Sequence, residues 1–209
     1  FVYLCAIVAA TSGLLFGFDI AVINGALIFL RQQFGLTEVQ TEFAASSLLV
    51  GCVFGASFAG WLSDRFGRKK VLIISAVLFA VSSVGAALPR NLTEFTIARF
   101  IGGLAIGVAS CLAPLYIAEV SPAHIRGRLV ALNQMTIVTG ILLAYFMNWI
   151  LSFTGPNGWR WMFLSAAIPS VAFFVALFFV PESPRWLTEN GREREALAEE
   201  LRAVVQDQK

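Results

Sequence analysis

The spacing of the charged side chains constrains this 209-residue chain more than any other feature. Five stretches contain no charged residue: 43–63, 71–89, 100–118, 129–159 and 161–181. An α-helix rises about 1.5 Å per residue, so about 20 apolar residues cross the hydrocarbon core of a bilayer. Each stretch is therefore long enough to be a transmembrane helix, and the fold class that they predict is all-α transmembrane.

A sixth apolar stretch opens the chain, and Asp19 is the only charged residue before about Leu30. The chain is 58% hydrophobic and 13% charged, which is too apolar for a soluble domain of this size and excludes most soluble enzymes. We expect six spans, at about 1–30, 43–62, 71–88, 95–120, 129–153 and 161–180.

Lys and Arg gather on one side of the predicted membrane. Only Arg31, Arg90 and Arg160 flank the spans on the opposite side, whereas the connections 63–70 and 121–128 and the C-terminal tail hold nearly all the others. Cytoplasmic loops carry the excess of Lys and Arg, so these connections and the tail are expected in the cytoplasm. We expect a multi-pass protein of the cell (plasma) membrane with a cytoplasmic C-terminal tail.

A polar segment follows the sixth span. The string Pro181-Glu182-Ser183-Pro184 ends the helix, because proline lacks a donor and disfavours helix at the residue before it. Helical spacing beyond it predicts an amphipathic helix with an apolar face of Leu197, Leu201, Val204 and Val205. We therefore divide the chain into a six-helix transmembrane bundle at 1–182 and a cytoplasmic helical segment at 183–209.

Several functional classes have little support. The formal net charge is +2 without a basic stripe, so we expect no nucleic-acid partner. Cys5, Cys52 and Cys111 lie in three different spans without a neighbouring histidine, so we expect buried small side chains, no metal and no cofactor. The only histidine, His124, lies in a cytoplasmic connection and no G-x-S-x-G string occurs, which argues against an intramembrane serine protease.

Asp19 and Arg99 lie inside predicted spans, where an ionised side chain costs about 2.5 kcal/mol or more. Mutual pairing is the simplest reason for their presence. A neighbouring guanidinium favours the carboxylate, whereas removal from water favours the protonated acid, so such a pair responds to water and to protons. A proton relay and a static pair that fixes helix packing both remain open. The two Cα levels differ by about 9 Å along the bundle, so pairing depends on the length of the arginine side chain.

Small residues recur one helical turn apart in three spans, a spacing that lets helix backbones approach closely in lipid. We expect tight helix packing at Gly13 and Gly17, Gly51 and Gly55, and Gly103 and Gly107.

The most specific string in the chain is Gly60-Trp61-Leu62-Ser63-Asp64-Arg65-Phe66-Gly67-Arg68-Lys69-Lys70. It resembles the G-x-x-x-D-R-x-G-R-K/R signature of the major facilitator superfamily, which lies between the second and third helices. Further strings resemble the sugar porter family of that superfamily, in the same order along the chain. Two of them combine two ranges each, namely residues 17–19 with 23–25 and residues 114–119 with 126–128. The others are residues 99–103, 133–134, 158–160 and 181–187.

This resemblance implies the N-terminal half of a transporter, folded as a six-helix bundle of two inverted three-helix repeats. It implies that the protein transports a monosaccharide by proton-coupled symport with alternating access. It also implies that the protein is a transporter and not an enzyme. The partners would be the sugar, the proton, the lipid bilayer and a C-terminal six-helix half that is missing here. A facilitative uniporter or exchanger and a non-transporting half-length subunit remain as alternatives.

The resemblance also implies residue roles. Asp19 would be the protonation site and Arg99 its partner. Gln134 would bind sugar hydroxyls, because an amide offers both a donor and an acceptor. The rest of the sugar-binding wall would be Phe16, Ile137, Val138 and Ile141. A cytoplasmic gate of ion pairs, completed by the other half, would consist of Asp64, Arg65, Arg68, Glu119, Arg126, Glu182 and Arg185. For Gln134 a helix-bridging amide, and for the apolar residues ordinary helix packing, remain open.

Overall fold

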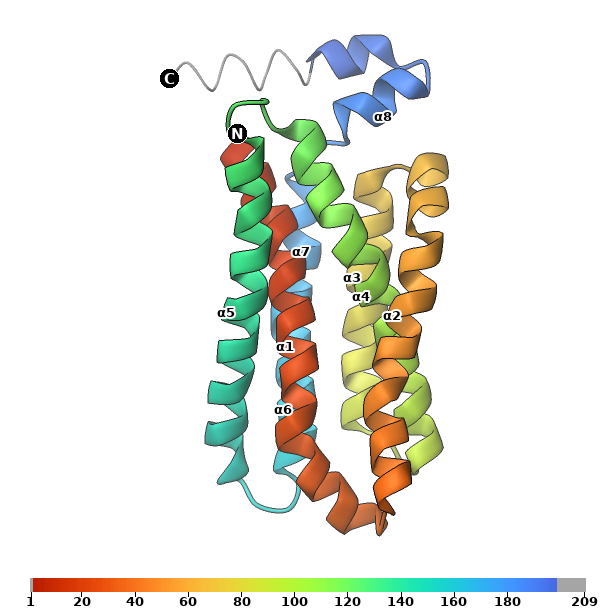
Figure 1. Ribbon diagram of the computed structural model, residues 1–209, viewed down its shortest axis with the longest axis vertical. Coiled ribbons are helices and arrows are strands. Elements are labelled where there is room, and N and C mark those ends of the chain that lie inside the picture. The colour runs from red at the N-terminus through yellow and green to blue at the C-terminus, as the bar shows by residue number, and fades with distance from the viewer. Residues whose placement is uncertain (1, 199–209) are drawn as a thin grey trace.

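The computed structural model describes residues 2–198, in which all regular secondary structure is helical. The helices run along the long axis of the molecule (Figure 1). In chain order they are α1 (Val2–Phe34), α2 (Glu38–Phe66), α3 (Arg68–Ala87), α4 (Leu92–Val120), α5 (Arg126–Ser152), α6 (Gly158–Ser165), α7 (Ala167–Phe178) and α8 (Pro184–Glu189). Residues 193–198 are also helical.

Six helical segments of this part of the chain are long and apolar enough to cross a membrane, with α6 and α7 together forming the sixth. The predicted all-α transmembrane fold is confirmed. Most of the helices extend a few residues beyond the predicted spans. The charge-free stretches mark the hydrocarbon core, whereas the helices continue to polar caps outside it. Thr37 and Gln40 form a capping box at the start of α2, and Asn91 caps α4.

The sequence predicts the sixth span as one unbroken helix over 161–180, and the structure differs from this prediction. The span begins at Gly158 and is divided at Ala166 into α6 and α7. Pro169 has no N–H to donate to the carbonyl of Ser165, so the regular ladder is interrupted there. An uninterrupted apolar run identifies a span but does not exclude such a break.

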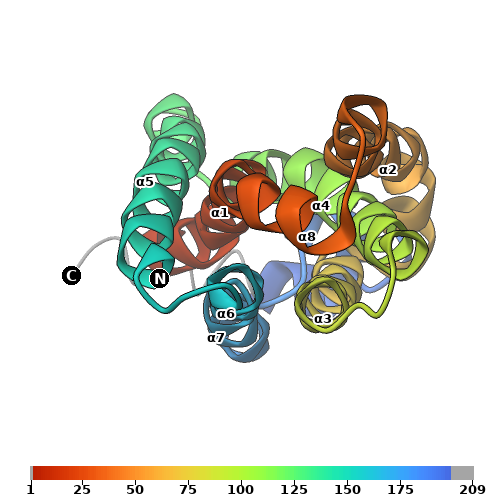
Figure 2. The same ribbon diagram turned by 90° about the horizontal axis from the view of Figure 1, so that it is seen from below.

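The helices form two rows (Figure 2). One row contains α5, α1, α4 and α2, and the other contains α6 with α7, and α3. The predicted tight packing is confirmed along two seams in the first row. A Cβ at Gly17 of α1 would overlap the carbonyl oxygen of Ile137 in α5, and a Cβ at Gly107 of α4 would overlap that of Cys52 in α2. The two seams are equivalent under the inverted repeat, because each joins the first helix of one repeat to the second helix of the other.

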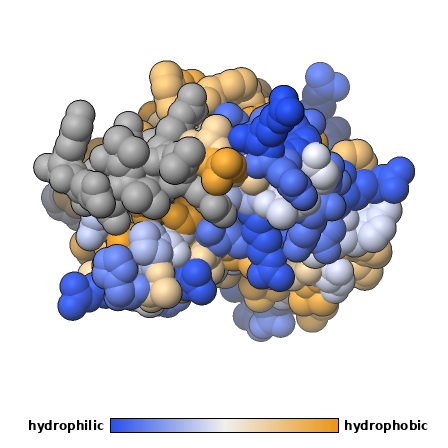
Figure 3. Space-filling view, turned by 90° about the horizontal axis from the view of Figure 1, so that it is seen from above, coloured by the Kyte–Doolittle hydropathy of each residue, from blue (hydrophilic) through white to orange (hydrophobic). Residues whose placement is uncertain are grey.

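One end of the bundle carries the N-terminus, the α2–α3 turn, the α4–α5 connection and α8 (Figure 1). Seen from that end, hydrophilic residues gather on the described surface and hydrophobic residues border it (Figure 3). Ala196 is buried with Trp186 and Leu187, whereas Leu197 is 58% exposed. Leu197, a member of the predicted apolar face, is thus not packed on the bundle, and the other members of that face lie outside the described residues.

Candidate functional site

Asp19 of α1 and Arg99 of α4 form a buried ion pair. Arg99 Nη1 donates to Asp19 Oδ1 at 2.6 Å, and Nη2 donates to the main-chain oxygen of Asp19 at 3.4 Å. The two residues are 3% and 2% exposed. The guanidinium carbon of Arg99 also lies 5.4 Å from the ring centre of Phe163. The arginine side chain thus spans the difference in depth, and the predicted pairing is present.

The pair is incompletely hydrogen-bonded among the described residues. Asp19 Oδ2 and Arg99 Nε are both buried without a partner there. A buried ion pair is stable only when its remaining donors and acceptors are also satisfied, so a purely structural pair is expected to engage both oxygens. Asp19 Oδ2 and Arg99 Nε therefore keep hydrogen-bonding capacity that the described residues do not use.

The predicted sugar-binding residues of α5 share one face of that helix. Gln134, Val138 and Ile141 are spaced by four and then three residues, so they lie one above another. Gln134 and Val138 are exposed, and Ile141 is half-buried. Ile137 is half-buried, and the main chains of Ile137 and Ile141 both form part of the seam against α1.

Phe16 lies on a neighbouring stripe of α1. Asn24, two helical turns further along α1, donates from Nδ2 to the hydroxyl of Tyr145 at 3.3 Å. Tyr145 lies one turn beyond Ile141 on the predicted face of α5. The two stripes therefore border one another. Sequence reasoning missed Asn24 and Tyr145 as members of this wall, although their helical spacing could have indicated them.

Arg68 is the centre of the ion-pair network at the polar end. Its Nε and Nη2 donate to the two carboxylate oxygens of Glu119, each at 3.2 Å, which is the bidentate geometry that suits guanidinium. Its Nη1 lies 3.1 Å from Asp64 Oδ1. Ser183 Oγ donates to Glu119 Oε2 at 2.5 Å. The network joins α2, α3, α4 and the segment after α7.

Glu182 contacts the ends of helices through its carboxylate. Its Oε1 accepts the main-chain N–H groups of Lys69 and Ser183, each at 3.0 Å, so it caps the start of α3 from another part of the chain. Trp186 Nε1 donates to the carbonyl oxygen of Asp64 near the end of α2 at 2.8 Å. Gly67 has φ 95°, and a Cβ there would overlap Glu182. We call residues 181–187 the capping segment.

Three predicted gate residues make contacts outside this network. Arg65 is exposed, with its guanidinium carbon 6.0 Å from the ring centre of Phe66. Arg126 donates to the carbonyl oxygen of Ser121 at 3.3 Å, and Arg185 to Glu189 within α8 at 3.3 Å. Within the described part of the chain they are not joined to Arg68 and Glu119. Sequence reasoning missed Ser183 and Trp186, because a search for charge does not find neutral donors.

The cysteines differ in burial. Cys5 is buried as predicted, Cys52 is half-buried, and Cys111 is exposed on the outside of α4. The prediction of burial is therefore wrong for Cys111, because a fully apolar helix does not reveal which of its faces is turned outwards.

The sequence of this chain is similar to those of known transporters. Residues 5–207 match the family described as "Sugar (and other) transporter". The chain is 44% identical over 209 residues to the glucose transport protein of Synechocystis sp., and that alignment covers 95% of this chain and 45% of that protein. It is 41% identical over 228 residues to the D-xylose-proton symporter of Escherichia coli (strain K12), covering 94% of this chain and 46% of that protein.

The fold is also similar to a solved structure of the major facilitator superfamily proton:xylose symporter XylE bound to 6-bromo-6-deoxy-D-glucose. The TM-score is 0.93 at 38% sequence identity, covering 100% of this chain and 52% of that chain. The chain thus spans about half the length of the relatives that it matches.

Proposed function

Because this chain belongs to the sugar porter family of the major facilitator superfamily, we propose that it is the N-terminal half of a proton-coupled monosaccharide transporter that works by alternating access. The family consists of secondary transporters and not of enzymes. The partner would be a C-terminal six-helix half, with the solute bound between the halves near the middle of the membrane.

The observation that carries the proposal is the buried Asp19–Arg99 pair with its free carboxylate oxygen. An unprotonated Asp19 attracts Arg99 and holds α1 to α4. A proton on Oδ2 would neutralise the carboxylate and weaken this attraction, because the guanidinium then faces a neutral acid. Proton binding would therefore bias the bundle between two conformations, as coupling requires.

The sugar would bind against the wall formed by Phe16 of α1 and the exposed face of α5. Gln134 supplies a donor and an acceptor for hydroxyl groups, while Val138 and Ile141 supply apolar contacts for the ring. Similarity to proteins named for glucose and xylose supports a monosaccharide as the solute.

The polar end would face the cytoplasm of a cell whose plasma membrane holds residues 1–182, with 183–209 as a cytoplasmic helical segment. The excess of Lys and Arg at that end supports this orientation. There the Arg68–Glu119 network would hold the cytoplasmic end closed while the sugar site faces outwards, and Arg65, Arg126 and Arg185 would find partners in the second half.

The test is Asp19→Asn in the full-length transporter, reconstituted in vesicles with an imposed pH gradient. We expect uphill sugar accumulation to fall at least tenfold, while exchange of labelled sugar stays within about twofold of wild type. Glu38→Gln is the control, because Glu38 is an exposed acid paired with Arg31 at the other end of the bundle.

Undiminished accumulation by Asp19→Asn would remove the coupling role. If in addition the wild-type protein takes up sugar without making the medium more alkaline, the function is that of a facilitative uniporter or exchanger. If the wild-type protein does not transport, the chain is a non-transporting subunit.

A further inference from the structure

We propose that the hollow between α1 and α2 is the path by which water, and with it protons, reaches the Asp19–Arg99 pair. This inference deepens the proposed function and rests on it. It assigns a role to α2, which contributes neither a charged side chain to the pair nor a residue to the predicted sugar-binding wall.

The hollow has a volume of about 180 Å³. It is bordered by Ile20 and Ile23 of α1 and by Ser46, Leu48 and Leu49 of α2, and Arg99 of α4 also lines it. A water molecule occupies about 30 Å³ in the liquid, so the volume is sufficient for several. Arg99 is the only charged residue among the side chains that line it.

Two atoms of the ion pair require hydrogen-bond partners that the described residues do not supply, namely Asp19 Oδ2 and Arg99 Nε. Buried polar atoms are usually satisfied by the protein or by ordered water. Because Arg99 itself lines the hollow, water there is positioned to reach the pair. Asp19 does not itself line the hollow, so the proton would pass from a hydronium ion beside Arg99 to Asp19 Oδ2: an O–H bond of the hydronium breaks, an O–H bond forms on the carboxyl group, and neutral water remains.

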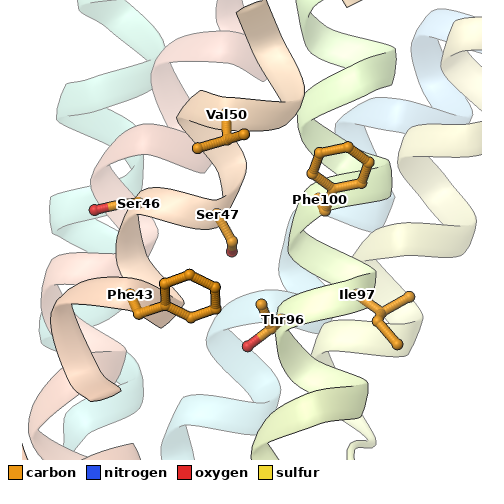
Figure 4. A pocket seen from close by; sticks show the side chains of 7 residues that line it. All are labelled: Phe43, Ser46, Ser47, Val50, Thr96, Ile97 and Phe100. Carbon is orange, nitrogen blue, oxygen red and sulfur yellow. The ribbon is translucent and has the colours of Figure 1, made fainter. Parts of the chain in front are cut away.

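A second and larger hollow of about 270 Å³ lies between α2 and α4 (Figure 4). It has no charged residue in its lining, and its hydroxyl groups at Ser47 and Thr96 are bonded to main-chain oxygens of their own helices at 2.8 Å. In Figure 4 the hydroxyl of Ser46 points away from Ile97 and Phe100 of α4. Of these two hollows, the one between α1 and α2 includes a member of the ion pair and the other does not.

Leu49 and Val50 provide a matched pair for the test. They are adjacent on α2 and similarly exposed, at 54% and 48%, but Leu49 borders the hollow at Arg99 and Val50 borders the other one. Each is changed to cysteine in the full-length transporter, in a background where Cys5, Cys52 and Cys111 are replaced by alanine. The rate at which a charged methanethiosulfonate reagent modifies each cysteine reports the access of that cysteine to water, because the reagent reacts with the thiolate. We expect Leu49→Cys to react at least tenfold faster than Val50→Cys; equal rates, or faster reaction of Val50→Cys, would overturn the proposal.

A larger side chain that fills each hollow tests whether protons pass through it. We expect Leu49→Trp to lower proton-driven sugar accumulation at least fivefold while sugar exchange stays within about twofold of wild type, and Val50→Trp to leave both within about twofold. If Leu49→Trp does not insert, Leu49→Phe and Val50→Phe replace the pair.

If wild type transports sugar without protons, the proposed function fails and this inference with it. If wild type is coupled and filling the hollow leaves coupling intact, this inference alone is wrong.

Discussion

Arg99 shows how one side chain joins two helices in a place where charge is costly. Its planar guanidinium contacts a carboxylate oxygen, a main-chain oxygen and an aromatic ring at the same time. A planar guanidinium offers several N–H donors and a flat face, so it can make contacts of all three kinds. A lysine ammonium has the same charge but not this geometry. The pair is therefore specific to arginine as well as to positive charge.

Gln134 is the residue at which sugar binding is most directly testable. We expect Gln134→Ala to weaken sugar affinity about tenfold, which corresponds to about 1.4 kcal/mol, because one donor and one acceptor for hydroxyl groups are lost. Affinity is measured by equilibrium binding to the purified full-length protein. Gln32→Ala is the control, since Gln32 is an exposed amide at the far end of α1. Unchanged affinity in a normally inserted Gln134→Ala protein would exclude Gln134 from the site.

Candidate functional residues could be predicted from the sequence where a charged side chain lies inside an apolar span. Asp19 and Arg99 interrupt apolar spans, so the cost of charge in lipid singled them out and made mutual pairing the simplest expectation, while a proton relay and a static pair both stayed open. Ser183 and Trp186 were not predictable in this way. Their importance comes from the atoms that they face, Glu119 Oε2 and the carbonyl oxygen of Asp64, and those contacts depend on the packing of three separate helices.

At the scale of elements, the glycine seams fix which helices pair. The spacing of small residues predicted close approach, but not that α1 would meet α5 and that α2 would meet α4. The spacing along one helix does not contain the identity of the partner, which appears only in the contacts of Gly17 with Ile137 and of Gly107 with Cys52. The break between α6 and α7 was also missed, because Pro169 lies within an apolar run that is long enough for one helix.

The seams predict opposite effects for one substitution at two glycines. Gly17→Ala should destabilise the protein, because the added methyl group overlaps the carbonyl oxygen of Ile137, and such overpacking costs about 1–3 kcal/mol. Gly60→Ala in α2 should be neutral or stabilising, by up to about 1 kcal/mol, because its Cβ meets no atom within 4 Å and alanine favours helix. Thermal unfolding in detergent measures both. Equal effects of the two substitutions would contradict the seam.

At the scale of the whole molecule, charge and hydropathy divide the surface between polar ends, of which the end with α8 holds most of the Lys and Arg, and apolar sides. Large hydrophobic side chains such as Phe58, Val81 and Phe178 are more than half exposed on those sides, at 57%, 61% and 57%. Apolar exposure of this kind suits contact with lipid or with another apolar half. The same distribution made the membrane fold predictable, since it depends on composition and not on individual contacts.

The orientation follows from the polar end and is tested with reporter fusions in a bacterial host. We expect alkaline phosphatase to be inactive when it is fused after α8 and active when it is inserted at 154–157, the turn between α5 and α6, because the enzyme matures only outside the cytoplasm. A green fluorescent reporter at the same two positions should give the reverse pattern. Phosphatase activity after α8 would place the polar end outside and contradict the proposed topology.

The capping segment also has a consequence for the order of assembly. A chain is synthesised from its N-terminus, so residues 181–187 leave the ribosome after all the membrane helices described here. Until then the turn between α2 and α3 lacks the carboxylate of Glu182 and the indole donor of Trp186. The contacts that close this early turn are thus made by residues that emerge only after the sixth span, and completion of the six-helix bundle is a precondition for the finished turn.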